Sequence, residues 1–386
     1  MSTRGIVINT NHKNNASMIS GAASFPNHTP LNDLSPEEAL YISKMTISDL
    51  EAIRLVLQGD SVIDWFRLDF RTDSEIDLFL KVNGYDLYNV QDQKRLDKIR
   101  LEALQYLDER YPHRIPAELK ASDMTVQRLF IMASRSFRRS NIQMYACMLL
   151  KIMHTINHID GRELLHRCEL RASDIFKAVE RKVGTAVRTM QDEGFHIVDF
   201  YGSHKDKAAK ISKLLAKKEN HAAAIYDKIR FRIITSTVAD ILPMLYFLGR
   251  TICPFNYIIP GGSHNNLVSF PDLLEHFPSF RHYAGHLKRK SNVSRQLSFF
   301  TENEHTSNEF RVINFVSDIP IRVDEMLYTP DFIDLGRVIF VTVEFQIMDQ
   351  MNYQNNEMGE ASHSKYKQRQ TDAVNIRLGM QHAENR

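Results

Sequence analysis

The chain has 386 residues, and 49 lysine and arginine residues against 47 aspartate and glutamate residues give a formal net charge of +2. Hydrophobic residues make up 43% and charged residues 25%, a balance typical of folded globular proteins that excludes a mostly disordered chain. No apolar run reaches the roughly 18 residues that a membrane-spanning helix needs. The N-terminus lacks the apolar core of a secretory signal, and three scattered cysteines fit a reducing compartment, so we expect a cytoplasmic protein with no membrane partner.

The N-terminal part is expected to be helical after a flexible leader. Residues 1–34 are dominated by Asn, Ser, Thr, His and Pro without an apolar period, which predicts the leader. A helix start follows, with Ser35 as the cap, Pro36 in the first turn and Glu38 able to reach back to the cap. Helical spacing of apolar residues then continues, which predicts an all-helical domain over residues 35–195.

Near residue 196 the pattern changes to short β-rich runs separated by Gly, Pro and Asn. The expected strands are HIVDFYG, IRFRIITS, FNYIIPGG, FRVINFVSDIPIRV and RVIFVTVEFQI, and the expected helices between them are ISKLLAKKE and VADILPMLYFLGR. PGGSHNN, after the third strand, is expected to form a tight turn. This interleaving predicts an α+β fold in which residues 196–370 form a mixed β-sheet flanked by helices, followed by a tail at 371–386.

The basic residues are unevenly distributed. Residues 201–300 contain 15 lysines and arginines and 6 aspartates and glutamates, a local excess of +9. Such a segment suits phosphate-rich ligands, either nucleotides or nucleic acid. A solvated helix face explains the same excess and stays open as an alternative.

The strand RVIFVTVEFQI carries a carboxylate among β-branched residues. Alternation places Phe340, Thr342, Glu344 and Gln346 on one face of this strand. Two interpretations remain open: the face lines a pocket, or the strand lies at the edge of the sheet with one solvated face.

The strand run AIYDKIRFRIITS presents a basic stripe. Lys228, Arg230 and Arg232 alternate onto one face, whereas Asp227 is out of phase and must lie where the strand begins or at a bulge. An acidic group there, facing Glu344 across a pocket, suits Mg²⁺, which takes one or two protein carboxylates together with waters and phosphate oxygens. A surface aspartate beside a lysine is the alternative.

Residues 344–367, EFQIMDQMNYQNNEMGEASHSKYK, resemble the closing motif of RelA/SpoT-type alarmone synthetases, E-x-Q-I-R-T followed by E-x-G-x-A-x-H-x-x-Y-K. Nine positions agree in register: Glu344, Gln346, Ile347, Glu357, Gly359, Ala361, His363, Tyr366 and Lys367. Upstream, KISKLLAKKENHAAAIYDKIRFRII is similar to the family's basic helix followed by D-x-x-x-x-R. NEFRVINFV is similar to its N-G-Y-x-S-L-H strand.

The resemblance implies a nucleotidyltransferase-like sheet that moves pyrophosphate from ATP to the 3′-hydroxyl of a guanine nucleotide, as in (p)ppGpp synthesis, or of an RNA end, with Mg²⁺ as cofactor. It implies that Asp227 and Glu344 hold Mg²⁺, with Glu344 also able to take the proton of the attacking hydroxyl. Arg232 would neutralise the donor phosphates and Phe310 would stack on the acceptor base. The other implied nucleotide-binding residues are Lys205, Lys213, Lys228, Arg230, Asn314, Gln346, Glu357, His363 and Lys367. Transfer of this type depends on positioning and charge neutralisation.

Three departures from the family pattern favour a different function. Ser203, Ala209 and Met348 stand where the family has Arg, Ser and Arg, so three polar groups that face phosphate are missing. The alternative is a catalytically inactive nucleotide- or RNA-binding regulatory protein that keeps the fold. Basic residues in the run KRKSNVSR, 288–295, either restore the lost charge or contact a longer polyanion such as RNA.

A histidine pair in the helical domain has two interpretations. His154 and His158 stand one helical turn apart with Asp160 nearby, a spacing that can chelate a metal ion. Histidines at this spacing are also common on helix faces, where they serve packing.

Overall fold

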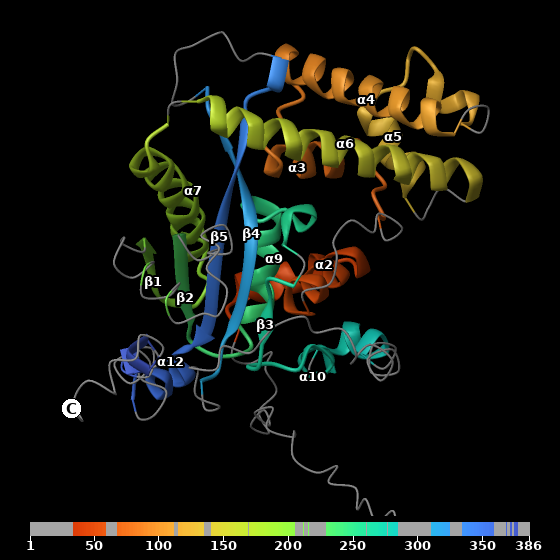
Figure 1. Cartoon of the computed structure of the whole chain (residues 1–386). Helices are drawn as coiled ribbons and strands as arrows, with labels where there is room; N and C mark the ends of the chain where they lie inside the picture. Colours follow the sequence, from red (N-terminus) through yellow and green to blue (C-terminus); the bar gives the residue numbers. More distant parts are fainter. Residues whose placement is uncertain are drawn as a thin grey trace, which may run out of the picture.

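The structure, a computed structural model, describes residues 34–58, 68–111, 115–134, 140–168, 170–204, 211, 215, 229–259, 261–275, 277–284, 310–324, 334–358, 368, 371–372 and 374–376. Within these ranges helices precede and flank a mixed β-sheet, which confirms the α+β class (Figure 1). The α-helices are α1 (Pro36–Lys44), α2 (Ile47–Gln58), α3 (Asp73–Val82), α4 (Val90–Arg110), α5 (Val126–Ala133), α6 (Ser140–Arg167), α7 (Ala172–Asp192), α9 (Ile241–Thr251), α10 (Phe270–Glu275) and α12 (Gln350–Glu357). The described residues also form 3₁₀ turns at Ala117–Lys120, Phe255–Tyr257 and Pro278–Phe280.

The described sheet has five strands in the order β1-β2-β5-β4-β3. Their bounds are Ile197–His204 (β1), Ile229–Thr235 (β2), His264–Asn265 (β3), Ile313–Arg322 (β4) and Val338–Asp349 (β5). β2 and β5 run parallel, and the other pairs are antiparallel. Because β5 lies between β2 and β4, the interpretation of its sequence as an edge strand is wrong.

The predicted start of the first helix is confirmed. The Ser35 Oγ accepts a hydrogen bond from the Glu38 N–H at 3.1 Å, and a Glu38 carboxylate oxygen accepts one from the Ser35 N–H at 2.9 Å. This reciprocal capping box satisfies two backbone donors that a helix start otherwise leaves unpaired. It also fixes the side chain of Glu38 at the first turn of α1.

The strand expected in FNYIIPGG is wrong. Residues Phe255–Tyr257 form a 3₁₀ turn, and of the segment's described residues only Ile258 makes a β-bridge, to Ser317. The Asn256 side chain is buried and donates a hydrogen bond to the Asn83 side chain at 2.7 Å. This long-range contact, which is absent from the local sequence pattern, stabilises the turn against the helical layer.

The tight turn expected in PGGSHNN is confirmed. The Gly262 N–H donates to the Ile259 carbonyl at 2.9 Å, and Gly261 has a φ of +70°, a conformation that glycine adopts without steric strain. The chain then enters β3, which pairs with β4.

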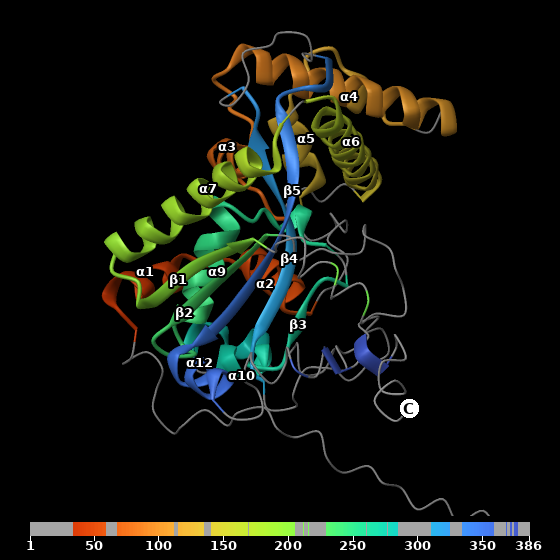
Figure 2. The ribbon, with the colours of Figure 1, turned by 60° about the vertical axis from the view of Figure 1, so that its left-hand side comes forward.

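One face of the sheet forms a large hydrophobic core with α1, α2, α7 and α9. Phe315 and Phe345 stack at its centre with ring centroids 5.1 Å apart, and Phe231 lies 6.0 Å from Phe345. Figure 2 shows α7 and α9 alongside β1 and β2, with α1 near one end of α7. Since α7 and β1 share this core, it spans the boundary predicted at residues 195 and 196.

A second core joins four of the other helices to the far end of β5. α3, α4, α5 and α6 pack together, and Val338 and Phe340 of β5 insert their side chains into this helical layer along with Tyr257. In Figure 1 these helices lie across the upper ends of β4 and β5. None of the helices in the described ranges is both long enough and apolar enough to cross a membrane.

Candidate functional site

One face of the sheet carries polar side chains that the strand register brings side by side. Arg230 lies opposite Glu344 and Arg232 opposite Gln346 across β2 and β5, while Asn314 of β4 lies opposite Gln346. The predicted alternation of both strands is confirmed at these positions. The polar cluster, as we name it, comprises Tyr201, Arg230, Arg232, Asn314, Glu344, Gln346 and Glu357.

The Glu344 carboxylate lies at the centre of this cluster and is 5% exposed. One oxygen accepts a hydrogen bond from Arg230 Nε at 3.0 Å. The other accepts from Asn314 Nδ2 at 2.8 Å and from Gln346 Nε2 at 3.3 Å. A buried carboxylate needs such donors because it has lost its hydration. Glu344 is therefore held by one cation and two amides.

Arg232 connects the cluster to two neighbouring elements. Its Nε and Nη2 donate to Gln346 Oε1 at 3.3 and 3.2 Å. Its Nη1 donates to the Tyr201 hydroxyl of β1 at 2.6 Å and to Glu357 Oε1 of α12 at 3.1 Å. The guanidinium carbon also lies 5.3 Å from the centre of the Tyr201 ring and 5.9 Å from that of Tyr353. Arg232 therefore links β1, β2, β5 and α12.

Sequence reasoning missed both tyrosines. Tyr201 follows the alternation of the predicted strand HIVDFYG, but its place opposite Arg232 depends on how β1 pairs with β2. Burial, together with the hydrogen bond to Tyr353 and against the charge of Arg232, raises the pKa of Tyr201 to about 12. The Tyr201 hydroxyl is thus a neutral hydrogen-bonding group at physiological pH.

Two residues that depart from the family pattern lie close to the cluster. Ser203 lies opposite Arg230 across β1 and β2. Met348 follows Glu344 and Gln346 on β5, and it is fully buried, with its sulfur accepting a hydrogen bond from the Asn356 side chain of α12 at 3.5 Å. α12 therefore covers the position where the family has an arginine.

Phe310 lies just before β4. Its half-buried side chain packs against the hydrophobic core of the sheet, and its carbonyl accepts a hydrogen bond from Asn266 Nδ2 at 2.6 Å. Stacking of this ring on a base stays a prediction.

Several sequence-predicted site residues lie outside the described residues. They are Lys205, Lys213, Asp227, Lys228, His363 and Lys367. Most of the basic excess of residues 201–300 falls outside the described ranges as well. Within the described part of the polar cluster, the two arginines are ion-paired to Glu344 and Glu357.

The described part of the cluster does not by itself fit Mg²⁺. Both oxygens of Glu344 accept hydrogen bonds, and Glu357 is paired with Arg232. Mg²⁺ takes oxygen ligands in near-ideal octahedral geometry, and the described residues offer no group of three metal-binding side chains here. The predicted magnesium site therefore depends on Asp227.

The histidine pair of α6 lies over the other end of the same sheet face. His158 Nε2 is 2.9 Å from Asp318 Oδ2, which Arg162 also contacts at 3.3 Å. The other Asp318 oxygen accepts a hydrogen bond from Thr342 at 2.6 Å, and His154 faces Asn256 at 3.3 Å. This network joins α6 to β4 and β5, which supports the packing interpretation of the pair.

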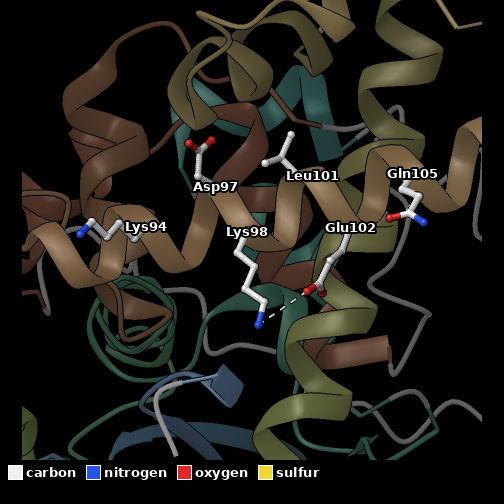
Figure 3. Close-up of a pocket in the computed structure, with 6 residues that line it drawn as sticks. All are labelled: Lys94, Asp97, Lys98, Leu101, Glu102 and Gln105. Carbon is white, nitrogen blue, oxygen red and sulfur yellow. Dashed lines mark ion pairs between the residues drawn. The ribbon is translucent and has the colours of Figure 1, made fainter.

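A shallow hollow along α4 is separate from the polar cluster (Figure 3). Its lining comes from one helix: Lys94, Asp97, Lys98, Leu101, Glu102 and Gln105. Lys98 and Glu102 form an ion pair across one turn at 3.9 Å. A hollow on one exposed helix face does not enclose a ligand.

Comparison with known proteins finds chains similar to this one among solved structures. No family model matches the chain, and no curated protein does. Small alarmone synthetase 1 from Bacillus subtilis is 14% identical with a TM-score of 0.27, covering 55% of this chain and 89% of that one. Its complex with the product pppGpp has the same identity and a TM-score of 0.26, covering 60% and 94%. A GTP pyrophosphokinase family protein from Streptococcus pneumoniae is 10% identical with a TM-score of 0.29, covering 55% and 87%. The chain is similar to these structures at low identity and low TM-score, so the function proposed below rests on the polar cluster.

Proposed function

We propose that this chain is a nucleotide pyrophosphokinase-like transferase, which moves pyrophosphate from ATP to the 3′-hydroxyl of a guanine nucleotide or of an RNA end. The observation that carries the proposal is the convergence of Arg230, Arg232, Glu344 and Gln346 from two parallel strands in one hydrogen-bonded network. Arg232, Glu344 and Gln346 are also the positions at which the sequence resembles the alarmone synthetases.

The cluster offers the groups that such a transfer needs. Arginine presents planar N–H donors that match phosphate oxygens, so incoming donor phosphates compete with the two glutamates for Arg230 and Arg232. That exchange frees the Glu344 carboxylate to accept the proton of the attacking 3′-hydroxyl. The bond between the α- and β-phosphates of ATP breaks, the acceptor oxygen bonds to the β-phosphorus, and AMP leaves.

The expected Mg²⁺ would neutralise the charge of the donor phosphates, with Asp227 as its protein ligand. Replacing Asp227 by asparagine should then weaken the dependence of nucleotide binding on Mg²⁺.

A second candidate has a specific observation in its favour. The Arg230–Glu344 contact and the two amides occupy both carboxylate oxygens, and Met348 is buried where the family has an arginine. This arrangement suits a protein that binds nucleotide or RNA on the cluster without turnover.

The test is transfer of label from ATP labelled in its β-phosphate to GDP, GTP or tRNA, with and without Mg²⁺. The key variant is E344Q, and the matched control is D324N, because Asp324 is also a carboxylate between arginines, Arg322 and Arg337. We expect E344Q to lower transfer about 100-fold or more, the usual size of a general-base contribution, while D324N stays within a few-fold of wild type.

Calorimetric titration with nucleotides separates the two candidates. Saturable binding without transfer to any acceptor would reject the transferase in favour of the binding protein. Absence of both binding and transfer would reject both functions, and equal loss of transfer in E344Q and D324N would remove Glu344 from the reaction.

A further inference from the structure

A second group of titratable side chains lies where α1, the start of β1 and the start of α9 meet. It consists of Glu38 in the first turn of α1, His196 just before β1 and Asp240 at the N-cap of α9. One ligand atom from each lies within 4.8 Å of the other two. Glu38 and Asp240 are fully buried, whereas the His196 side chain is 41% exposed. These residues take no part in the polar cluster.

The spacing of these atoms fits a tetrahedral ion. His196 Nδ1 is 3.3 Å from Glu38 Oε2 and 3.5 Å from Asp240 Oδ1. Two donors bound to Zn²⁺ at about 2.1 Å in tetrahedral geometry lie about 3.4 Å apart. His196 Nδ1 therefore stands at about the separation from each carboxylate that a shared ion imposes, and the two carboxylate oxygens lie within 4.8 Å of each other.

The donor atoms also have lone pairs available. Asp240 Oδ1 is buried and accepts no hydrogen bond from the described residues, while Oδ2 accepts from the Thr237 N–H at 2.7 Å and from its hydroxyl at 3.0 Å. Buried polar oxygens are rarely left without a partner. Glu38 is oriented by the Ser35 N–H and by the His196 N–H at 3.1 Å. Each carboxylate oxygen can accept a second contact, and ligands held by outer hydrogen bonds are typical of metal sites.

The charges of these three groups also favour a bound cation. Two fully buried carboxylates lie close to each other and to one imidazole. Such a pair needs a cation or a proton to offset its desolvation.

We propose that Glu38, His196 and Asp240 bind one divalent transition metal ion of the Zn²⁺ type, with a fourth position open to solvent beside His196. One imidazole nitrogen and two carboxylate oxygens are a donor set that zinc accepts, whereas Mg²⁺ and Ca²⁺ prefer oxygen ligands alone. The ion would link α1 to the start of β1 and to α9, and the proposal does not depend on the proposed function.

The test is calorimetric titration of the tag-free, chelator-treated full chain with Zn²⁺, repeated with Co²⁺ while visible absorption is recorded. The variants are H196N and D240N, and the matched control is H166N, because His166 is an exposed histidine on α6. We expect one Zn²⁺ site per chain in wild type and H166N. In H196N and D240N we expect Zn²⁺ to bind at least about 100-fold more weakly. At 100 times the dissociation constant, Zn²⁺ should raise the melting temperature by roughly 3 °C.

Three results would overturn the proposal: no saturable Zn²⁺ binding in wild type, equal affinity in wild type and H196N, or Co²⁺ absorption that survives in H196N. H196N alters a partly exposed side chain, so it tests the site even if D240N fails to fold. In that case circular dichroism identifies the folding defect of D240N.

Discussion

At the residue scale, the Arg230–Glu344 pair decides how the polar cluster is held together. Glu344 is 5% exposed and Arg230 supplies the cation in direct contact with it. Breaking a buried pair leaves an uncompensated charge, whereas removing both partners avoids that penalty. The effects of replacing Arg230 alone and Glu344 alone on the free energy of unfolding should therefore not be additive.

We expect R230M to lower the free energy of unfolding by about 2 kcal/mol, since it removes a charge-assisted hydrogen bond but keeps most of the side-chain volume. R230M/E344Q should be more stable than the sum of the single variants predicts, by about 1 kcal/mol or more. Urea unfolding of wild type and the three variants measures this coupling energy. Additivity within experimental error would mean that the contact does not stabilise the cluster.

The sequence predicted every residue of this cluster except Tyr201, but only part of its arrangement. Alternation along each strand placed Arg230 with Arg232 and Glu344 with Gln346, because side-chain direction in a strand has a strict period of two. It did not predict Tyr201 or the contact of Arg232 with α12, because pairing between strands depends on contacts far apart in the chain. Periodicity within one segment contains no information on which strand or helix lies beside it.

At the element scale, a glycine of α6 lies directly against β5. A Cβ atom on Gly161 would lie 2.5 Å from Phe340 Cε2 and 2.8 Å from the Val338 carbonyl oxygen. Backbone atoms cannot move aside as a flexible side chain can. The absence of a side chain at Gly161 therefore sets how closely α6 approaches β5.

We expect G161A to lower the free energy of unfolding by about 1–3 kcal/mol, because overpacking outweighs the higher helix propensity of alanine. G184A on α7 and G249A on α9 are matched controls. The nearest atom to the added Cβ is 3.6 Å away in the first, and none lies within 4 Å in the second. Both should be stabilised by up to about 1 kcal/mol. A stabilised G161A in chemical unfolding would show that α6 shifts freely.

Elements that depend on neighbouring residues were predicted well. Elements that depend on contacts between distant parts of the chain were not. The capping box at Ser35 and Glu38 spans four residues and was predicted from the sequence. The strand expected in FNYIIPGG was wrong because the segment is held as a turn by the contact between Asn256 and Asn83. That contact joins side chains 173 positions apart in the chain.

At the scale of the whole molecule, β5 belongs to both hydrophobic cores. Phe345 lies in the core beneath the sheet, and Phe340 lies in the helical layer of α3 to α6. The change of sequence pattern near residue 195 marks where helices give way to strands, but α1, α2 and α7 pack on the sheet. The pattern of residue types along the chain reflects local structure, so it did not indicate which helices share a core with which strands.

The junction of the two layers contains a histidine that is held neutral. Burial, together with the neighbouring His158 and against the charge of Asp318, lowers the pKa of His154 from 6.5 to about 4. The unfolded chain therefore binds a proton at His154 between pH 6.5 and 4 that the folded protein does not bind. Stability contributed by this group is present above pH 6.5 and is lost as the pH falls toward 4.

We expect the free energy of unfolding of wild type, relative to that of H154Q, to fall by roughly 3 kcal/mol between pH 7 and pH 4. The measured quantity is a difference between two proteins because Asp240 also titrates in this pH range. Its pKa is raised from 3.8 to about 6 in the folded protein, so its protonation adds stability as the pH falls toward 4. Asp240 is unchanged in both proteins, so its contribution cancels. Urea unfolding at pH 7, 5.5 and 4 measures the difference, with H166N as a control that should follow wild type. Parallel curves for wild type and H154Q would show that His154 is protonated in the folded protein and that the junction does not depend on a neutral imidazole.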